Sequence, residues 1–187
     1  DPYLASLVAS ARVIGYQGGS LDKTNTLLAC PKHYAGYGFA ESGKDYNTVS
    51  IDDYTLHNFV MPPFKAAIDA GAMSIMTSFN IIQGVPATAN DYLINEKLKK
   101  DWAFKGIVLS DWGSIAEMIT HGFSPSPIHA TQHAFLAGTD VDMEASFYTN
   151  HLKDLNTQNI VSNAKIDESV KRVLRVKFQL GLFDDPY

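Results

Sequence analysis

Short apolar segments alternate with amphipathic segments along most of this chain of 187 residues. We expect strands at 26–30, 72–79 and 106–110 and a shorter one at 139–143, with helices at 4–14, 56–68 (interrupted at Pro62 and Pro63), 90–100, 114–118, 129–136 and 167–178. Strands that alternate with helices are typical of a parallel α/β fold. An eight-stranded barrel takes about 250 residues. The sequence therefore predicts a partial TIM-type (β/α)8 barrel of about four βα units, forming a single incomplete domain over residues 1–187.

Composition and charge exclude several classes of partner. The net charge is -5, and the 15 Lys and Arg residues are scattered, so we expect no nucleic-acid and no membrane partner. The longest apolar runs are far shorter than the roughly 20 residues that a bilayer requires. The single cysteine, Cys30, excludes an internal disulfide framework. Gly36-Tyr37-Gly38 lacks the third glycine of a phosphate-binding loop, which argues against a nucleotide cofactor.

Polar and aromatic side chains follow the predicted strands where those strands end. Asp111 and Trp112 come directly after the strand that begins at Gly106. The other strand ends carry Lys32 and His33, Phe79 and Asn80, and Asp142 or Glu144. Parallel barrels keep their chemistry at these ends, although an aspartate there can equally cap the next helix, so both readings stay open for Asp111. An indole beside a carboxylate suits a sugar, whose C–H face packs on the ring while its hydroxyls bind polar groups.

A series of short motifs occurs in a fixed order along nearly the whole chain. They are Pro31–Gly38, Gly43–Asn47, Gly84–Thr88, Phe104–Gly106 followed by Ser110–Trp112, and Arg172–Phe178 followed by Gly181–Phe183. Together they closely resemble glycoside hydrolase family three, in its bacterial β-glucosidase branch. The resemblance implies the later part of the N-terminal barrel domain of that family.

The same resemblance implies roles for individual residues. Asp111 would be the nucleophile of a retaining mechanism, while Lys32 and His33 would bind hydroxyls of the sugar that is cleaved. A cation such as Lys32 would also favour the ionised form of Asp111. Trp112 would flank the sugar. Phe79 falls where many relatives carry a tyrosine, so it is a candidate only for packing in the wall of the site.

A retaining mechanism also needs an acid/base carboxyl group. The N-acetylglucosaminidase branch supplies it from an Asp-Ser-His loop, where this chain has Lys44–Asn47. The resemblance therefore implies an acid/base glutamate on a second α/β domain, which is absent from residues 1–187. We expect a segment of an exo-acting β-glucosidase that acts on a β-glucoside or oligosaccharide without a cofactor, in a periplasmic or secreted protein. The alternative is a non-catalytic carbohydrate-binding remnant or an inactive fragment.

A metal-dependent hydrolase is a further hypothesis for this chain. His129 and His133 are four residues apart, and Asp140, Asp142 and Glu144 alternate along a predicted strand, so a metal-dependent hydrolase could use Asp140, Asp142 and His129. Caps and ion pairs are the favoured interpretation of these residues, and we predict no metal.

A partial barrel exposes strand edges and helix faces, which favours self-association of the isolated chain.

Overall fold

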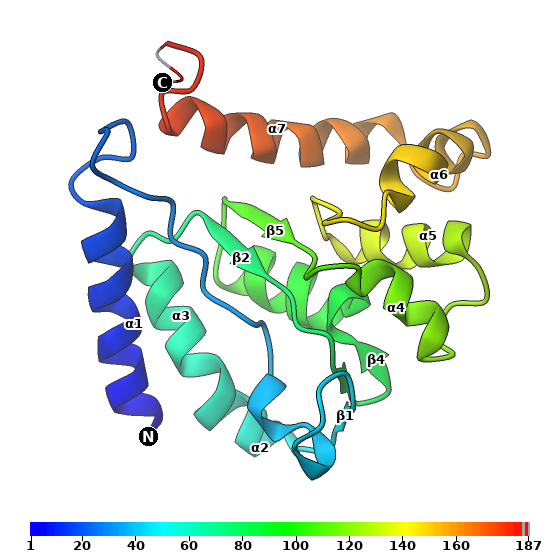
Figure 1. Cartoon of the computed structure of the whole chain (residues 1–187), viewed down its shortest axis with the longest axis horizontal. Coiled ribbons are helices and arrows are strands. Elements are labelled where there is room, and N and C mark those ends of the chain that lie inside the picture. Colours follow the sequence, from blue (N-terminus) through cyan, green and yellow to red (C-terminus); the bar gives the residue numbers. More distant parts are fainter. Residues whose placement is uncertain (185, 187) are drawn as a thin grey trace.

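The computed structural model describes residues 1–184 and residue 186 (Figure 1). The α-helices are α1 (Pro2–Gln17), α2 (Asp53–Thr55), α3 (Met61–Asp69), α4 (Ser114–Thr120), α5 (Pro127–Ala137), α6 (Phe147–Thr157) and α7 (Asn163–Gln179). The π-helices are η3 (Leu56–Val60) and η5 (Tyr92–Asp101), and the 3-10 helices are η1 (Tyr37–Phe39), η2 (Glu41–Gly43) and η4 (Ala87–Ala89). The strands are β1 (Thr48–Val49), β2 (Ser74–Met76), β3 (Ile81–Ile82), β4 (Val85–Pro86) and β5 (Ile107–Leu109).

The centre of the fold is a parallel arrangement of extended segments. β2 pairs with β5 in parallel, with Ile75 opposite Val108. Parallel bridges then extend the arrangement on both sides, from Thr77 to Tyr34 and from Leu109 to Val141. Helices α3 and η5 lie between successive segments along the chain, and β2 and β5 occupy the middle of the molecule (Figure 1). This order confirms the predicted parallel α/β fold.

The first predicted strand, 26–30, is wrong as a regular strand. The segment is extended, but the N–H of Leu27 donates to the carbonyl of Tyr16 and the N–H of Ala29 to the side chain of Gln17. The end of α1 thus takes donors that a strand ladder would use, and Pro31 has no N–H to offer. The predicted strand at 139–143 is likewise reduced to the bridge at Val141.

Three other elements differ from the sequence-based expectation. Helix α6 is not among the expected helices, although Tyr148, Leu152 and Leu155 lie at helical spacing and pack in one apolar cluster. The last helix begins at Asn163 rather than 167, since the side chain of Ser162 caps it by accepting the N–H of Lys165. The segment around Gly84 forms more than a turn: β3 and β4 pair antiparallel, and β1 joins β3 in parallel.

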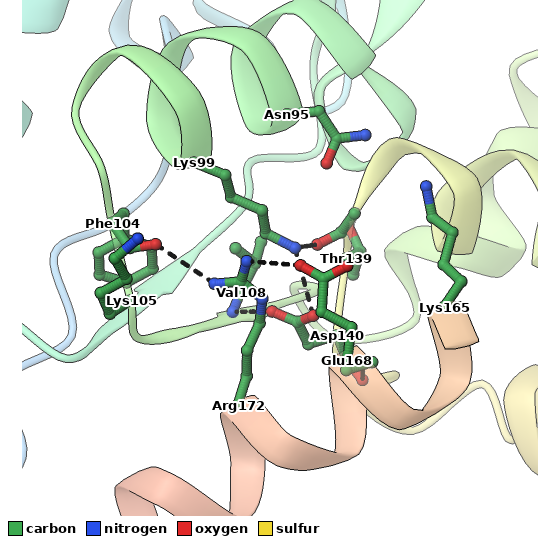
Figure 2. Close-up of polar contacts among 12 residues, drawn as sticks. Asn95, Lys99, Phe104, Lys105, Val108, Thr139, Asp140, Lys165, Glu168 and Arg172 are labelled. Atoms are coloured by element: carbon green, nitrogen blue, oxygen red, sulfur yellow. Dashed lines mark hydrogen bonds and ion pairs between the residues drawn. The ribbon is translucent and has the colours of Figure 1, made fainter. Parts of the chain in front are cut away.

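A buried polar cluster attaches α7 to the parallel segments. Lys99 Nζ lies 3.3 Å from Asp140 Oδ1, and Asp140 Oδ2 accepts the N–H of Val108 at 2.9 Å. Arg172 of α7 donates to the carbonyl of Phe104 and to Glu168. Figure 2 shows Lys99 reaching from η5 toward Asp140 while Arg172 reaches in from α7. Asp140 therefore forms the ion pair that was the favoured interpretation of its sequence position.

Candidate active site

Asp111 lies two residues beyond the end of β5, in the turn that leads into α4. Gly113 has a φ of 66°, a left-handed conformation that glycine adopts without steric cost. This turn lets the N–H of Trp112 donate to Asp111 Oδ1 at 2.7 Å and the N–H of Ser114 to the Asp111 carbonyl at 3.1 Å. Asp111 is 8% exposed, so its carboxylate is nearly buried and is held in a defined position by these contacts.

His33 contacts the same carboxylate from a different parallel segment, the one that Tyr34 joins to Thr77. Its Nε2 lies 3.2 Å from Asp111 Oδ2. The neighbouring Tyr34 is fully buried, and it anchors this segment through its N–H, which donates to Met76, and its hydroxyl, which donates to Leu93. The fold thus joins two of the residues that the sequence singled out.

The protonation of His33 follows from its surroundings. Burial lowers the pKa of His33 and outweighs the carboxylate of Asp111, which raises it, while the charge of Lys32 lowers it further. The imidazole is therefore neutral at pH 7. Because a carboxylate can only accept, Nε2 carries the hydrogen of this contact.

An aromatic wall extends from His33 along one side of the site. The rings of His33 and Tyr37 lie 5.1 Å apart, those of Tyr37 and Phe79 6.3 Å, and those of Phe79 and Tyr46 4.5 Å. Burial, followed by the charge of Asp45, raises the pKa of Tyr37 to about 12, so its hydroxyl stays protonated. Phe79 lies between Tyr37 and Tyr46 in this row of rings, and its place in the wall of a sugar site stays a prediction.

Trp112 and Lys32 are both exposed. Trp112 is exposed beside Asp111, whereas Lys32 lines a cavity next to α1 and α3. Trp112 is 65% exposed, which leaves its ring available beside Asp111. Lys32 lines a cavity of about 460 Å³ together with Val13 and Tyr16 of α1 and Phe64 of α3. Among the described residues it forms no ion pair with Asp111, and the side chain that contacts Asp111 is His33.

The chain matches the family model described as the glycosyl hydrolase family 3 N terminal domain over residues 1–176. It belongs to this family. It is 40% identical to a periplasmic beta-glucosidase of Salmonella typhimurium and 37% identical to a putative beta-xylosidase of Formosa agariphila, covering 100% of this chain in both cases and 24% and 25% of those proteins. A crystal structure of a β-glucosidase from Listeria innocua in complex with glucose superimposes with a TM-score of 0.98 at 42% identity, over 100% of this chain and 26% of that one.

Membership of glycosyl hydrolase family 3 confirms the resemblance drawn from the short motifs. It also agrees with the parallel segments, since the N-terminal domain of this family is a TIM-type barrel. The chain spans about a quarter of the length of the relatives that it matches.

In this family 3 domain, the segment after Val141 forms hydrogen bonds with the two residues that flank the Asp111 turn, Ser110 and Gly113. The Met143 N–H donates to Ser110 Oγ at 2.8 Å, and the Gly113 N–H donates to the Met143 carbonyl at 2.9 Å. Asp142 does not join the site, because its Oδ2 accepts the N–H of Tyr148 in the first turn of α6. Glu144 is exposed and lies next to Gly113.

The histidines of the metal interpretation have structural partners in this family 3 domain. His129 Nδ1 lies 2.8 Å from Ser126 Oγ, and His133 Nδ1 lies 2.9 Å from Ser124 Oγ. Within residues 1–184 and 186, no group of three or more His, Cys, Asp or Glu side chains is arranged to hold a metal ion. Asn80 is also structural, because it is fully buried and donates to the carbonyl of Ala35.

Sequence reasoning missed Tyr37, Asp45 and Tyr46 as neighbours of the site. Tyr37 lies within the motif Pro31–Gly38, and Asp45 and Tyr46 lie within Gly43–Asn47. The presence of both motifs was a usable signal that these loops meet. Nothing in their spacing showed that Phe79 would be the residue that joins them.

Proposed function

We propose that this chain is the part of a retaining, exo-acting β-glucosidase that carries the catalytic nucleophile, Asp111. The observation that carries the proposal is the placement of Asp111 beyond the end of β5, between the N–H of Trp112 and the imidazole of His33. In the first step a carboxylate oxygen of Asp111 bonds to the anomeric carbon while the bond to the leaving oxygen breaks. The product of this step is a glycosyl ester on Asp111.

The second carboxyl group of the mechanism comes, in this proposal, from outside residues 1–187. It protonates the leaving oxygen in the first step and then removes a proton from the attacking water, which releases the sugar and regenerates the Asp111 carboxylate. In retaining enzymes the two carboxyl groups stand about 5 to 5.5 Å apart. The side chain of Asp111 is 12% exposed, and in this proposal the sugar and the acid/base group approach it from that exposed part.

The substrate of the proposal is a terminal β-D-glucosyl residue. Lys32 and His33 would bind its hydroxyls, the exposed ring of Trp112 would cover its C–H face, and Phe79 would form part of the wall. The Listeria innocua β-glucosidase, 42% identical to this chain, has been crystallised with glucose, and a mutant of it with laminaribiose. Glucose is therefore favoured over xylose, although relatives named as xylosidases match at 31–37% identity.

We also propose that the protein acts outside the cytoplasm. This rests on the 40% identical relative from Salmonella typhimurium, which is named a periplasmic beta-glucosidase. Among the described residues, no helix has the length and apolar character needed to cross a membrane.

The test is hydrolysis of aryl β-D-glucopyranoside by the protein expressed with its native flanking sequence. Proton NMR of the first sugar released is expected to show the β anomer, and aryl β-D-xylopyranoside is expected to be the poorer substrate. An α anomer as first product would exclude retention. Sugar binding in calorimetry without hydrolysis would instead support a carbohydrate-binding remnant.

A further inference from the structure

Thr88 ends the motif Gly84–Thr88, to which the proposed function gives no role. It is 1% exposed and lies in the short helix η4. Its Oγ1 is 2.9 Å from Oγ1 of Thr77 and 2.8 Å from Oγ of Ser114. Its carbonyl accepts the hydroxyl of Thr139 at 2.8 Å. One residue therefore contacts three segments that are far apart in the sequence.

Two of these contacts lie beyond the C-terminal ends of strands, because Thr77 directly follows β2 and Ser114 begins α4 after β5. The third, Thr139, lies at the start of the segment that reaches Val141. Thr88 thus connects the residues after β2 and β5 with this segment. It contacts neither His33 nor Asp111 directly in the described structure.

The contact with Thr77 connects Thr88 to the backbone next to His33. The next residue, Ser78, donates its N–H to the carbonyl of Tyr34 at 2.9 Å and its hydroxyl to the carbonyl of Ala35 at 3.0 Å. His33 immediately precedes Tyr34. A shift of Thr77 would therefore move the backbone that carries the imidazole.

The Ser114 contact leads to Asp111. The N–H of Ser114 donates to the Asp111 carbonyl at 3.1 Å, so Ser114 closes the turn that presents the carboxylate. The Thr139 contact leads to the segment whose Met143 holds Ser110 and Gly113 on either side of Asp111. All three contacts of Thr88 thus act on residues adjoining the His33 to Asp111 pair.

The hydroxyl groups in this cluster depend on one another. Thr77 and Ser114 are 0% and 3% exposed, and among the described residues each hydroxyl finds its hydrogen-bond partner in Thr88. Buried polar groups are nearly always paired, and leaving one unpaired is costly. Removing the Thr88 hydroxyl would leave two buried hydroxyls without this partner, which favours movement of the two segments toward new partners.

We propose that Thr88 is a positioning residue that fixes the turn of Asp111 relative to the segment of His33. It acts through Thr77 and Ser114 and does not touch the sugar. This inference rests on the proposed function, because it assumes that Asp111 is the nucleophile. A carboxylate that must meet the anomeric carbon in line is sensitive to small displacements, since a misplacement of about 1 Å can cost about a hundredfold in rate.

The experiment compares Thr88→Val and Thr88→Ser in the protein with its native flanking sequence. The probe is 2-deoxy-2-fluoro-β-D-glucosyl fluoride, which traps the glycosyl ester. We expect Thr88→Val to lower the first-order rate constant of labelling at saturation by about tenfold, with little change in the concentration needed for half saturation. Thr88→Ser keeps the hydroxyl and is expected to label within about threefold of the wild type.

Thr131→Val is the matched control. Thr131 is also fully buried, but its hydroxyl donates to the carbonyls of Pro127 in its own helix, α5, and of Phe147 in α6. We expect this variant to lose thermal stability while it labels at the wild-type rate. If Thr131→Val slows labelling as much as Thr88→Val does, the effect is general loss of stability and the inference is wrong.

The remaining outcomes separate this inference from the proposed function. Labelling of a residue other than Asp111 in the wild type would overturn the proposed function. Labelling of Asp111 at an unchanged rate in Thr88→Val would overturn the positioning role alone. If Thr88→Val does not fold, Ser114→Ala and Thr77→Val replace it. Each then removes one contact and must slow labelling for the inference to stand.

Discussion

Nε2 of His33 lies 3.2 Å from Oδ2 of Asp111, and the two residues come from the ends of different parallel segments. Since burial keeps the imidazole neutral, it serves this carboxylate as a hydrogen-bond donor rather than as a counter-ion. The contact orients the carboxylate without neutralising it. An oriented, ionised carboxylate is what attack on an anomeric carbon requires.

The charges around His33 predict that two substitutions shift its pKa in opposite directions. The carboxylate of Asp111 raises the pKa of His33 and the ammonium group of Lys32 lowers it, both against a larger lowering by burial. We expect NMR titration of His33 to give a pKa below the ordinary 6.5. Asp111→Asn should lower this pKa further, and Lys32→Met should raise it. Shifts in the same direction in both variants would contradict the described arrangement.

The same lowered pKa affects stability. Because the folded state binds the proton on His33 less readily than the unfolded state, the contribution of His33 is present above about pH 6.5 and is lost as the pH falls through the folded pKa. His33→Asn should therefore show a shallower loss of unfolding free energy in this range, measured by urea unfolding at several pH values.

Removing one partner of the buried pair of Lys99 and Asp140 should destabilise the fold strongly. Their side chains are 12% and 3% exposed, and burial lowers the pKa of Lys99 and raises the pKa of Asp140. Removing one partner leaves the other charge buried, so we expect Asp140→Ala to lower the free energy of unfolding by about 3 kcal/mol. Lys99→Met combined with Asp140→Asn should recover part of this loss, because asparagine can still accept the N–H of Val108.

The exposed pair Lys65 and Asp69 is the control for this measurement. It is also an ion pair, at 2.6 Å, but its side chains are 40% and 59% exposed. Water screens such pairs, so Asp69→Ala should change stability little. Equal losses in Asp69→Ala and Asp140→Ala would show that burial does not determine the effect.

The exposed indole of Trp112 should affect substrate binding more than stability. With 65% of the residue exposed, Trp112→Ala should leave the melting temperature nearly unchanged. We expect it to raise KM for aryl β-glucosides by about tenfold, because it removes the apolar surface for the sugar ring, while Trp112→Phe retains part of that surface. A KM unchanged in Trp112→Ala would remove this residue from the sugar site.

The parallel fold could be predicted from the alternation of apolar and amphipathic segments, and the position of Asp111 beyond a strand could be predicted from its place after Gly106–Ser110. Thr88, Tyr37 and Tyr46 could not be found in this way, because their roles depend on contacts between loops. Such contacts leave no periodic signal in one chain. The strand predicted at 26–30 is wrong for a similar reason, since N–H groups of this segment donate to the end of α1 and not to a neighbouring strand.

Exposed apolar residues on α1 and α7 lead to a prediction about residues 1–187 made alone. Leu4, Leu7 and Ile14 of α1 are 52–61% exposed, and Phe178 of α7 is 63% exposed. Contiguous apolar faces of this kind favour association. Sedimentation velocity should show concentration-dependent oligomers, which Leu7→Lys should weaken. A monomer that persists at high concentration would contradict the prediction.

The most direct test of the central claim is the site of covalent labelling by 2-deoxy-2-fluoro-β-D-glucosyl fluoride in the protein with its native flanking sequence. Peptide mass spectrometry of the inactivated protein should find the fluoroglucosyl group as an ester on Asp111, and Asp111→Ala should remove both labelling and turnover. A label on another carboxylate, or turnover that survives in Asp111→Ala, would contradict the assignment of Asp111 as the nucleophile.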